Sequence, residues 1–361
     1  MGYAYQGFKE GMTLTHTHLI NMEEAIISNS QGGLEDLYAS SYGVLPGEVA
    51  PSKMTALLNA ASIGNKTIRF NDGIYIFAEQ IKVPSNVSLV GSTKTVFKPK
   101  SASSPTILMR IDQADNVFVS HITLDGGLTS KPTAASEGTQ YGMAVMASRS
   151  VNIENVDFVG WNNCGLYSLQ MSSFGTEGSG DGKWFKQLQI TNCRFYFNYR
   201  GSYLYYGSEY NQLLNCVFGE NYIGSINCGG NNSYVSCQWN VNTIGFKLEN
   251  SGGNPAHGGC VGCTFNHNYE TAIQVDDCVN GWTFTGCQIF YANVNVINSK
   301  GVIFTGNVWG QCTYYSSGNP NSNLITNTFF ASNSSTILAN NDGSTLVYCC
   351  LPNYLPSNIT T

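Results

Sequence analysis

The stretch that decides the fold lies between residues 188 and 290, where one short pattern recurs. It reads Ile190-Thr-Asn-Cys193-Arg-Phe195, Leu213-Leu-Asn-Cys216-Val-Phe218, Tyr234-Val-Ser-Cys237-Gln-Trp239, Cys260-Val-Gly-Cys263-Thr-Phe265 and Phe284-Thr-Gly-Cys287-Gln-Ile289. With weaker copies on both sides, the last apolar residue of each copy falls at positions 158, 195, 218, 239, 265, 289, 309 and 329. After a first interval of 37 residues, the copies are 20 to 26 residues apart, a period typical of a solenoid.

The interior of one repeat indicates which kind of solenoid this is. Apolar and polar residues alternate through Ile190, Cys193 and Phe195, with a kink before the cysteine, and alternation of this kind predicts a strand. An Asn follows three or four residues later, and then a small residue opens a second alternating run. Leucine-rich repeats share this period, but their Leu-x-x-Leu-x-Leu signature is missing. Two or three short strands per repeat, without a helical period, predict coils of a parallel β-helix.

At this level the chain resembles the right-handed parallel β-helices of the pectate-lyase superfamily, over roughly residues 55 to 345. The resemblance implies an all-β solenoid of about ten coils. It also implies that a turn Asn stacks coil upon coil through its side-chain amide. The positions that match this ladder are Asn198, Asn221, Asn242 and Asn268.

The cysteines follow the same repeat. Five of the twelve occupy one column, and stacked strands lie about 4.8 Å apart, so their side chains should point inward one above another. Buried Cys behaves as a small hydrophobic residue, and we expect reduced thiols rather than disulfides at Cys193, Cys216, Cys237, Cys263 and Cys287. Twelve cysteines without a signal peptide favour folding in a reducing cytosol.

Composition excludes two classes of partner. Only 11% of the 361 residues are charged, the net charge is −6 and the pI is about 5.3. A nucleic-acid partner is not expected, because phosphate binding requires a basic surface. No run of 18 apolar residues is present, so no membrane span is expected.

Residues 1–33 form a separate segment with apolar residues at helical spacing, and Gln31-Gly-Gly33 resembles a hinge. The stretch from Gly11 to Glu24, with its Leu-Thr and His-Leu-Ile-Asn-Met-Glu-Glu elements, resembles the N-terminal helix of tail fibres and tailspikes of phages that infect Gram-positive bacteria. That resemblance implies attachment to a phage tail or baseplate through this segment, a homotrimer and a place in the virion tail. The chain would be made in the host cytoplasm without a signal peptide.

The remaining chain divides into three parts. Residues 34–100 resemble the entry segment of tailspike β-helices, in which a short amphipathic helix from Pro51 to Ala61 covers the first coil. Residues 101–345 are the β-helix proper, and residues 346–361 form a C-terminal tail. Long insertions at Asp125–Tyr141, Gln170–Lys186 and Asn250–Gly259 should line a binding face, and a groove is expected between the last two.

Carboxylates are the strongest candidates for chemistry on this surface. Alignment of Phe246-Lys-Leu-Glu249 with Ile273-Gln-Val-Asp276 places Glu249 and Asp276 in one outward column of adjacent coils, about 4.8 Å apart at the backbone. Two carboxyl groups about 5 Å apart suit a retaining glycosidase, whereas a separation of about 6.5 to 9.5 Å suits an inverting one, so the second group would be a nucleophile or a base. Like charges this close also raise one pKa, as a general acid requires. The alternative is that Asp276 begins a turn and Glu249 caps a loop. Reserve candidates are Glu220, Glu270 and Asp277.

A glycan should also contact aromatic and polar side chains near the insertions, because aromatic rings stack on the apolar faces of sugars. The candidates are Trp184, Tyr167, Tyr203, Tyr205, Lys247, Gln274 and His257. The combined hypothesis is a tailspike-type protein that binds and cleaves a bacterial surface polysaccharide, without a metal or other cofactor. One alternative is a non-catalytic receptor-binding protein. Another is a pectate-lyase-like enzyme, for which Ca²⁺ and a Lys or Arg base would be needed.

Overall fold

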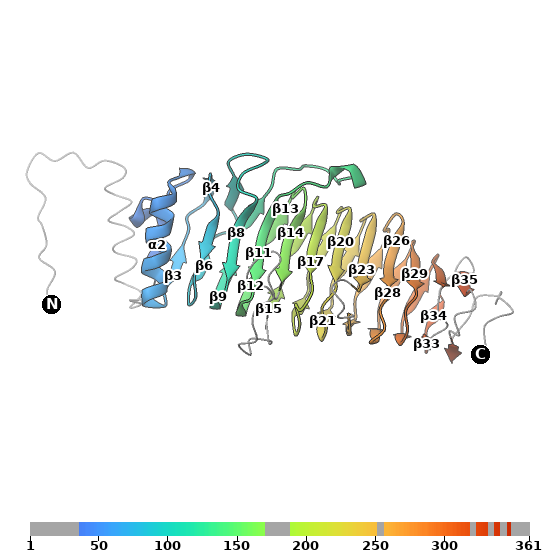
Figure 1. Cartoon of the computed structure of the whole chain (residues 1–361). Helices are drawn as coiled ribbons and strands as arrows, with labels where there is room; N and C mark the ends of the chain where they lie inside the picture. Colours follow the sequence, from blue (N-terminus) through green and yellow to red (C-terminus); the bar gives the residue numbers. More distant parts are fainter. Residues whose placement is uncertain are drawn as a thin grey trace, which may run out of the picture.

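The chain folds into a parallel β-solenoid of three sheets that run the length of the molecule (Figure 1). This computed structural model describes residues 36–169, 188–250, 256–317, 323–330, 336–339 and 345–347, the last two ranges as backbone only. The strand pairs of all three sheets are parallel, and each strand pairs with its counterparts in the coils before and after it. The parallel solenoid expected from the repeat is therefore confirmed, with about eleven coils.

Each coil contributes one strand to each sheet. Sheet A contains β1 (Asp36–Tyr38), β3 (Thr67–Arg69), β6 (Ser88–Val90), β9 (Asp115–Ser120), β12 (Arg149–Glu154), β15 (Leu188–Thr191), β18 (Gln212–Leu214), β21 (Asn232–Val235), β24 (Gly258–Val261), β27 (Trp282–Thr285), β30 (Val302–Thr305), β33 (Leu324–Thr326) and β36 (Thr345–Val347). Sheet B contains β2 (Gly47–Val49), β4 (Gly73–Phe77), β7 (Thr95–Pro99), β10 (Thr123–Asp125), β13 (Asp157–Val159), β16 (Arg194–Tyr196), β19 (Val217–Gly219), β22 (Gln238–Asn240), β25 (Thr264–Asn266), β28 (Gln288–Phe290), β31 (Val308–Gly310) and β34 (Phe329–Phe330).

Sheet C carries the candidate site. It contains β5 (Ile81–Val83), β8 (Ile107–Asp112), β11 (Tyr141–Met146), β14 (Cys164–Leu169), β17 (Arg200–Leu204), β20 (Ile223–Asn227), β23 (Ile244–Glu249), β26 (Thr271–Asp276), β29 (Asn293–Ile297), β32 (Thr313–Ser317) and β35 (Thr336–Ala339). Near the start of several of these strands a small residue is required. At Gly224 an added Cβ would lie 2.4 Å from the Gly245 carbonyl oxygen of the next coil.

Helix α2 (Pro51–Gly64) covers the first coil, as expected, and extends three residues beyond Ala61. Its buried side chains pack on the coil, and they are Met54, Leu57, Leu58 and Ala61. Two short 3-10 helices complete the described elements: η1 (Ala39–Tyr42) and η2 (Ala134–Ser136). The N-terminal segment 1–33, including its expected helix, lies outside the described residues.

The marker residues of the repeat form the core of sheet B. The rings of Phe158, Phe195, Phe218, Trp239 and Phe265 stack in register, with centroids 4.6 to 5.2 Å apart and planes within 8°. One marker in the sequence pattern was wrong by a residue. Trp309 pairs with Phe330, which is buried, whereas Phe329 is 52% exposed and pairs with Val308. The pattern misplaced it because two adjacent Phe residues both fit an apolar position.

The polar interior follows the predicted ladders. Asn221 Oδ1 accepts hydrogen bonds from the backbone N–H and the side-chain amide of Asn198, and Asn242 and Asn268 continue the series. All four amides are buried. The five column thiols are also buried and free, and each donates to a carbonyl of the preceding coil. Burial raises the pKa of the Cys237 thiol, and slow reaction with thiol reagents in the native state stays a prediction.

Candidate active site

Strand alternation points four polar side chains of two adjacent coils outward from sheet C. Lys247 and Glu249 lie on β23, and Gln274 and Asp276 lie on β26. The strands pair in register, Lys247 opposite Gln274 and Glu249 opposite Asp276. The alignment made from the sequence therefore gave the register without error. Asp276 lies in the strand itself, and the turn begins at Asp277.

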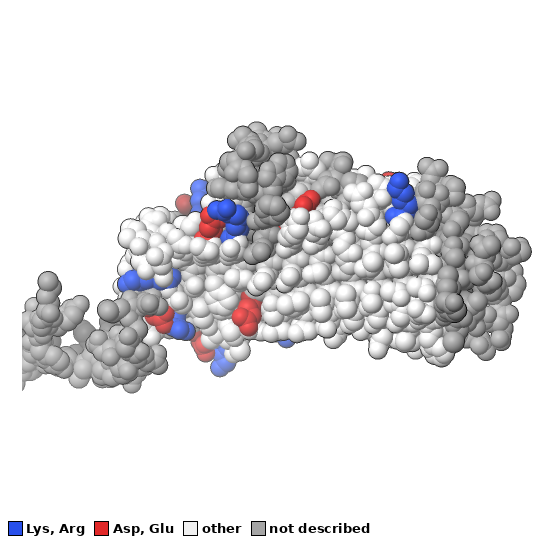
Figure 2. Space-filling model, turned by 90° about the horizontal axis from the view of Figure 1, so that it is seen from below, with Lys and Arg blue, Asp and Glu red and all other residues white. Residues whose placement is uncertain are grey.

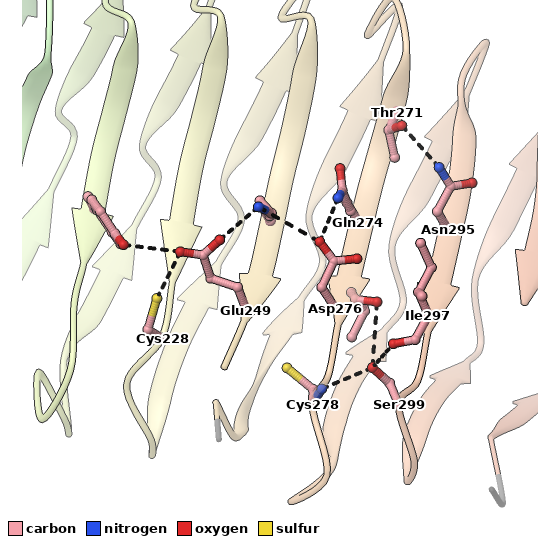
Figure 3. Close-up of polar contacts among 12 residues, drawn as sticks. Cys228, Glu249, Thr271, Gln274, Asp276, Cys278, Asn295, Ile297 and Ser299 are labelled. Atoms are coloured by element: carbon pink, nitrogen blue, oxygen red, sulfur yellow. Dashed lines mark hydrogen bonds and ion pairs between the residues drawn. The ribbon is translucent and has the colours of Figure 1, made fainter. Parts of the chain in front are cut away.

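Lys247 joins the two carboxylates into one cluster. Its Nζ lies 2.7 Å from Glu249 Oε2 and 3.7 Å from Asp276 Oδ2. Gln274 Nε2 donates to the same Asp276 oxygen at 2.6 Å. Figure 3 shows Glu249 and Asp276 projecting from neighbouring strands toward a shared contact. The carboxylates are thus held close by a common cation.

Glu249 receives two further donors from earlier coils. The Tyr203 hydroxyl on β17 donates to Glu249 Oε1 at 3.0 Å, and Cys228 Sγ, just after β20, lies 3.5 Å from the same oxygen (Figure 3). Both Glu249 oxygens therefore face donors, an arrangement that favours the ionised carboxylate. We refer to Tyr203, Lys247, Glu249, Gln274 and Asp276 as the sheet-C cluster.

The pKa values of Lys247 and Asp276, the two titratable neighbours of Glu249 in the cluster, are both raised, with different consequences. Burial raises the pKa of Asp276, and the nearby charges of Glu249 and Asp277 add to this rise, while Gln274 and Lys247 oppose it. Burial by itself lowers the pKa of Lys247, but the hydrogen bond to Glu249 and the charges of both carboxylates outweigh it, and the pKa is raised. Lys247 therefore stays protonated, and Asp276 holds a proton more readily than an ordinary Asp.

Tyrosines line the sheet on the N-terminal side of the cluster. Tyr203 packs edge-on against Tyr205 at 5.3 Å and against Tyr167 at 5.6 Å. Tyr203 and Tyr205 are partly exposed, whereas Tyr167 is only 6% exposed. Tyr167, named from the sequence as a ligand contact, therefore supports the neighbouring rings and does not present a face of its own.

The other residues named from the sequence lie elsewhere. Glu220 and Glu270 are exposed on the turn between sheets B and C, and their charges act on Lys131. Asp277 is exposed at a left-handed turn position with φ 54°. His257 precedes β24 and lies beside Gly230. Trp184, the whole expected wall Gln170–Lys186 and residues 251–255 of the second wall lie outside the described residues.

Residues 126–140, from the first of the three insertions expected to line a binding face, form a strap that was not expected to be a wall of the groove. Its Glu137 accepts from Arg200 at 2.6 Å, and Arg200 also donates to Asn163 at 3.1 Å. The Arg200 guanidinium lies 5.7 Å from the Tyr203 ring centre, so the strap is linked to the cluster through two residues. Farther along, Lys131 lies 3.4 Å from the Tyr269 ring centre. The sequence predicted the insertion but not its contact with the site, because Glu137 and Arg200 are 63 positions apart.

The sheet-C cluster is partly buried, with the side chains of Lys247, Glu249 and Asp276 exposed to 22, 20 and 25%. A cavity of about 380 Å³ lies elsewhere, between α2 and β5, and is lined by residues such as Met54, Leu58 and Ile81. Within the described ranges, no group of three or more His, Cys, Asp and Glu residues is arranged to hold a metal ion. No helix in that part of the chain is long and apolar enough to cross a membrane.

Comparison with solved structures finds the same solenoid in several proteins. The A-module of Azotobacter vinelandii mannuronan C-5 epimerase AlgE4 matches with a TM-score of 0.60 at 13% identity, over 90% of this chain and 99% of that one. The pre-mature gene product 12 of bacteriophage phi29 matches with a TM-score of 0.59 at 14% identity, over 95% of this chain and 53% of that one. The fold is shared with phage tail proteins and with polysaccharide-modifying enzymes.

A third match is the enzymatically active domain of tailspike protein 2 from bacteriophage CBA120, with a TM-score of 0.55 at 12% identity. It covers 87% of this chain and 47% of that one, so the chain spans about half the length of the two phage proteins. No family model matches the sequence, and no curated protein matches it. At these identities the likeness concerns the fold, as the repeat predicted.

Proposed function

We propose that the protein is a tailspike-type protein that binds a bacterial surface polysaccharide on the outer face of sheet C and cleaves it. The observation that carries this proposal is the in-register pair Glu249 and Asp276, bridged by Lys247. Paired residues on adjacent strands lie about 4.8 Å apart at the backbone, close to the carboxyl separation of about 5 Å used by retaining glycosidases.

The electrostatics assign the two carboxyl groups different roles in this proposal. Asp276, whose pKa is raised, is the general acid that donates a proton to the glycosidic oxygen as the bond breaks. Glu249, oriented by the Lys247 and Tyr203 donors, is the nucleophile and attacks the anomeric carbon from the opposite face. Water then hydrolyses the glycosyl ester, with Asp276 acting as base in this second step. Tyr203 and Tyr205 would stack on the sugars that flank the cleaved bond.

This arrangement favours hydrolysis over elimination. A lyase of this fold would need a base to remove the proton next to a sugar carboxylate, and Lys247 is a poor base because its pKa is raised. The donor set does not suit Ca²⁺ either, because the two carboxylates share a lysine and the described residues contain no third acidic ligand in the cluster.

A binding-only function is the second candidate, and one observation favours it. The same Lys247 bridge that orders the carboxylates also resembles a structural ion-pair network, and such networks shift pKa values without catalysis. Reducing-sugar release from purified host polysaccharide tests the enzyme. Release supports hydrolysis, whereas retention of the polysaccharide without release leaves a receptor-binding protein. A product absorbing near about 230 nm would indicate an unsaturated sugar and hence a lyase, since elimination leaves a double bond that hydrolysis does not.

The proposal extends to assembly and location. We propose a homotrimer in a virion tail, attached to the tail or baseplate through residues 1–33, in keeping with the helical spacing of Leu19, Met22 and Ile26. Light scattering at micromolar concentration tests the assembly. A mass three times that of the chain is expected, and a monomer would contradict it. Removal of residues 1–33 should reduce the mass if this segment holds the trimer.

A further inference from the structure

The charges around sheet C point to the class of glycan that it accepts. We propose that the ligand is a neutral or amino-bearing polysaccharide, and that polymers rich in carboxylate or phosphate are rejected. This inference rests on the proposed glycan-binding function and concerns the same face.

Acidic residues outnumber basic ones on and around this sheet. From residue 188 to 317 the described ranges contain four basic residues, Arg194, Arg200, Lys247 and Lys300. They contain six acidic residues, all on sheet C or on the turns at its two edges: Glu209, Glu220, Glu249, Glu270, Asp276 and Asp277. Arg194 lies on sheet B and pairs with Asp157. The face that would hold the glycan is therefore negative overall.

Two of the cations on this face, Lys247 and Arg200, already have anionic partners. Lys247 contacts two carboxylates, at 2.7 and 3.7 Å. Arg200 is bound to Glu137 and its side chain is only 17% exposed. A sugar carboxylate or phosphate arriving at the cluster would meet one lysine shared by two acids. It would have to compete with a carboxylate for that lysine, at a cost in desolvation.

Negative charges close to Asp276 help to raise its pKa, and an anionic ligand would add another negative charge there. Burial comes first, and the charges of Glu249 and Asp277 contribute to the rise. Another negative charge at the same place would meet Glu249 in a partly buried setting, where like charges interact more strongly than in water. Rejection of a wrong ligand by an uncompensated like charge is a general route to specificity.

The charged residues of two insertions, 170–187 and 251–255, do not change this excess of negative charge. The segment 170–187 contributes two acidic residues, Glu177 and Asp181, and two basic residues, Lys183 and Lys186. The segment 251–255 contributes no charge. The partly exposed rings of Tyr203 and Tyr205 offer apolar area with a hydroxyl at its edge, which suits the apolar faces and hydroxyls of neutral sugars.

The test begins with an array of purified bacterial polysaccharides grouped as neutral, amino-bearing, uronate-containing and phosphate-containing. The full chain should bind members of the first two groups. For a bound neutral polymer, Kd is then measured before and after oxidation of its primary hydroxyls to carboxylates. Oxidation should weaken binding by about tenfold or more, and the Kd of the neutral polymer should change less than about twofold between about 20 and 300 mM salt.

Charge variants link the effect to this face. Asp276→Asn and Glu249→Gln each remove one negative charge, so each should recover part of the affinity lost on oxidation. Thr285→Ala, on the outer face of sheet A, is the matched control and should recover none. Preferential binding of uronate or phosphate polymers, or equal binding of the oxidised polymer, would overturn the inference while leaving glycan binding intact. A folded protein that binds no member of the array would overturn the proposed function itself.

Discussion

The outer face of sheet C and the outer faces of sheets A and B share one backbone geometry but carry different chemistry. From Gln212 to Phe329, the described outward positions of sheets A and B hold Thr, Ser, Asn, Gln, Gly and apolar residues, with no Lys, Arg, Asp or Glu. The same coils place Lys247, Glu249 and Asp276 on sheet C. Figure 2 shows one side of the molecule on which most charged side chains gather toward the N-terminal end.

This difference indicates which face of the solenoid carries the candidate chemistry. Every coil has three outward faces, and the inward positions fix the fold without specifying them. Two faces remain uncharged along these six coils, while the third concentrates titratable groups with altered pKa values. Because such groups cluster at functional sites, sheet C is the face to which the predictions assign activity, and sheets A and B serve as its built-in control.

The largest expected effect separates the two faces by activity. Glu249→Gln and Asp276→Asn preserve shape and remove the proposed nucleophile and acid, so each should lower turnover of the host polysaccharide by about 100-fold or more. Thr285→Ala on sheet A should leave turnover within about twofold of the wild type. Reducing-sugar assays provide the measurement. Full activity in both carboxyl variants would remove the distinction between the faces.

A second contrast compares the inside of a coil with its outer face. Asn242→Ala leaves the Asn221 donors and the Phe218 carbonyl without their partner, so the free energy of unfolding should fall by about 3 kcal/mol. Asn240→Ala, two residues earlier on the exposed face of sheet B, loses only a contact to Gln238 and should cost less than about 0.5 kcal/mol. Chemical denaturation measures both. Equal losses would mean that the outer face contributes more than its contacts suggest.

The third prediction concerns the cation of the cluster. Lys247→Met leaves two neighbouring carboxylates without the charge between them, so unfolding free energy should fall by about 1 to 2 kcal/mol at neutral pH. The loss should shrink at about pH 4, where protonation of Asp276 relieves the repulsion, because its pKa is raised. Lys300→Met, at an exposed turn, is the matched control and should change stability by less than about 0.5 kcal/mol. A pH-independent loss would point to packing rather than charge.

The smallest effect is a pH dependence of stability. The folded protein binds the Asp276 proton more tightly than the unfolded chain, because burial raises this pKa. Protonation therefore favours folding, and the contribution falls as pH rises through the ordinary Asp pKa and then the raised one. Asp276→Asn removes this dependence. The stability of the variant should therefore rise relative to that of the wild type above the raised pKa of Asp276, and should not rise below the ordinary Asp pKa. Thermal unfolding across the pH range tests the sign, and a relative gain at low pH would contradict it.

Features that depend only on neighbouring coils of similar length could be predicted from the sequence. The Asn ladder and thiol column came from local spacing, and the Glu249 and Asp276 register came from two aligned strands. Side-chain contacts between coils separated by insertions of different length could not be predicted. Tyr203 meets Glu249 across 46 positions, and the loop lengths between them set the register. Which Tyr remained exposed also could not be predicted, because Tyr167 and Tyr203 occupy the same outward column.

The amide ladder gives the solenoid a direction in its side chains as well as in its chain. Each Asn oxygen accepts from the preceding coil, so the four amides share one orientation along the axis. Growth by duplication of a whole coil between Asn198 and Asn268 would keep every donor matched to an acceptor. Beyond Asn268 the position is taken by Ala292 and then Cys312, whose thiol donates back to the Ile289 carbonyl. Simple repetition of a coil therefore preserves the amide ladder only between Asn198 and Asn268.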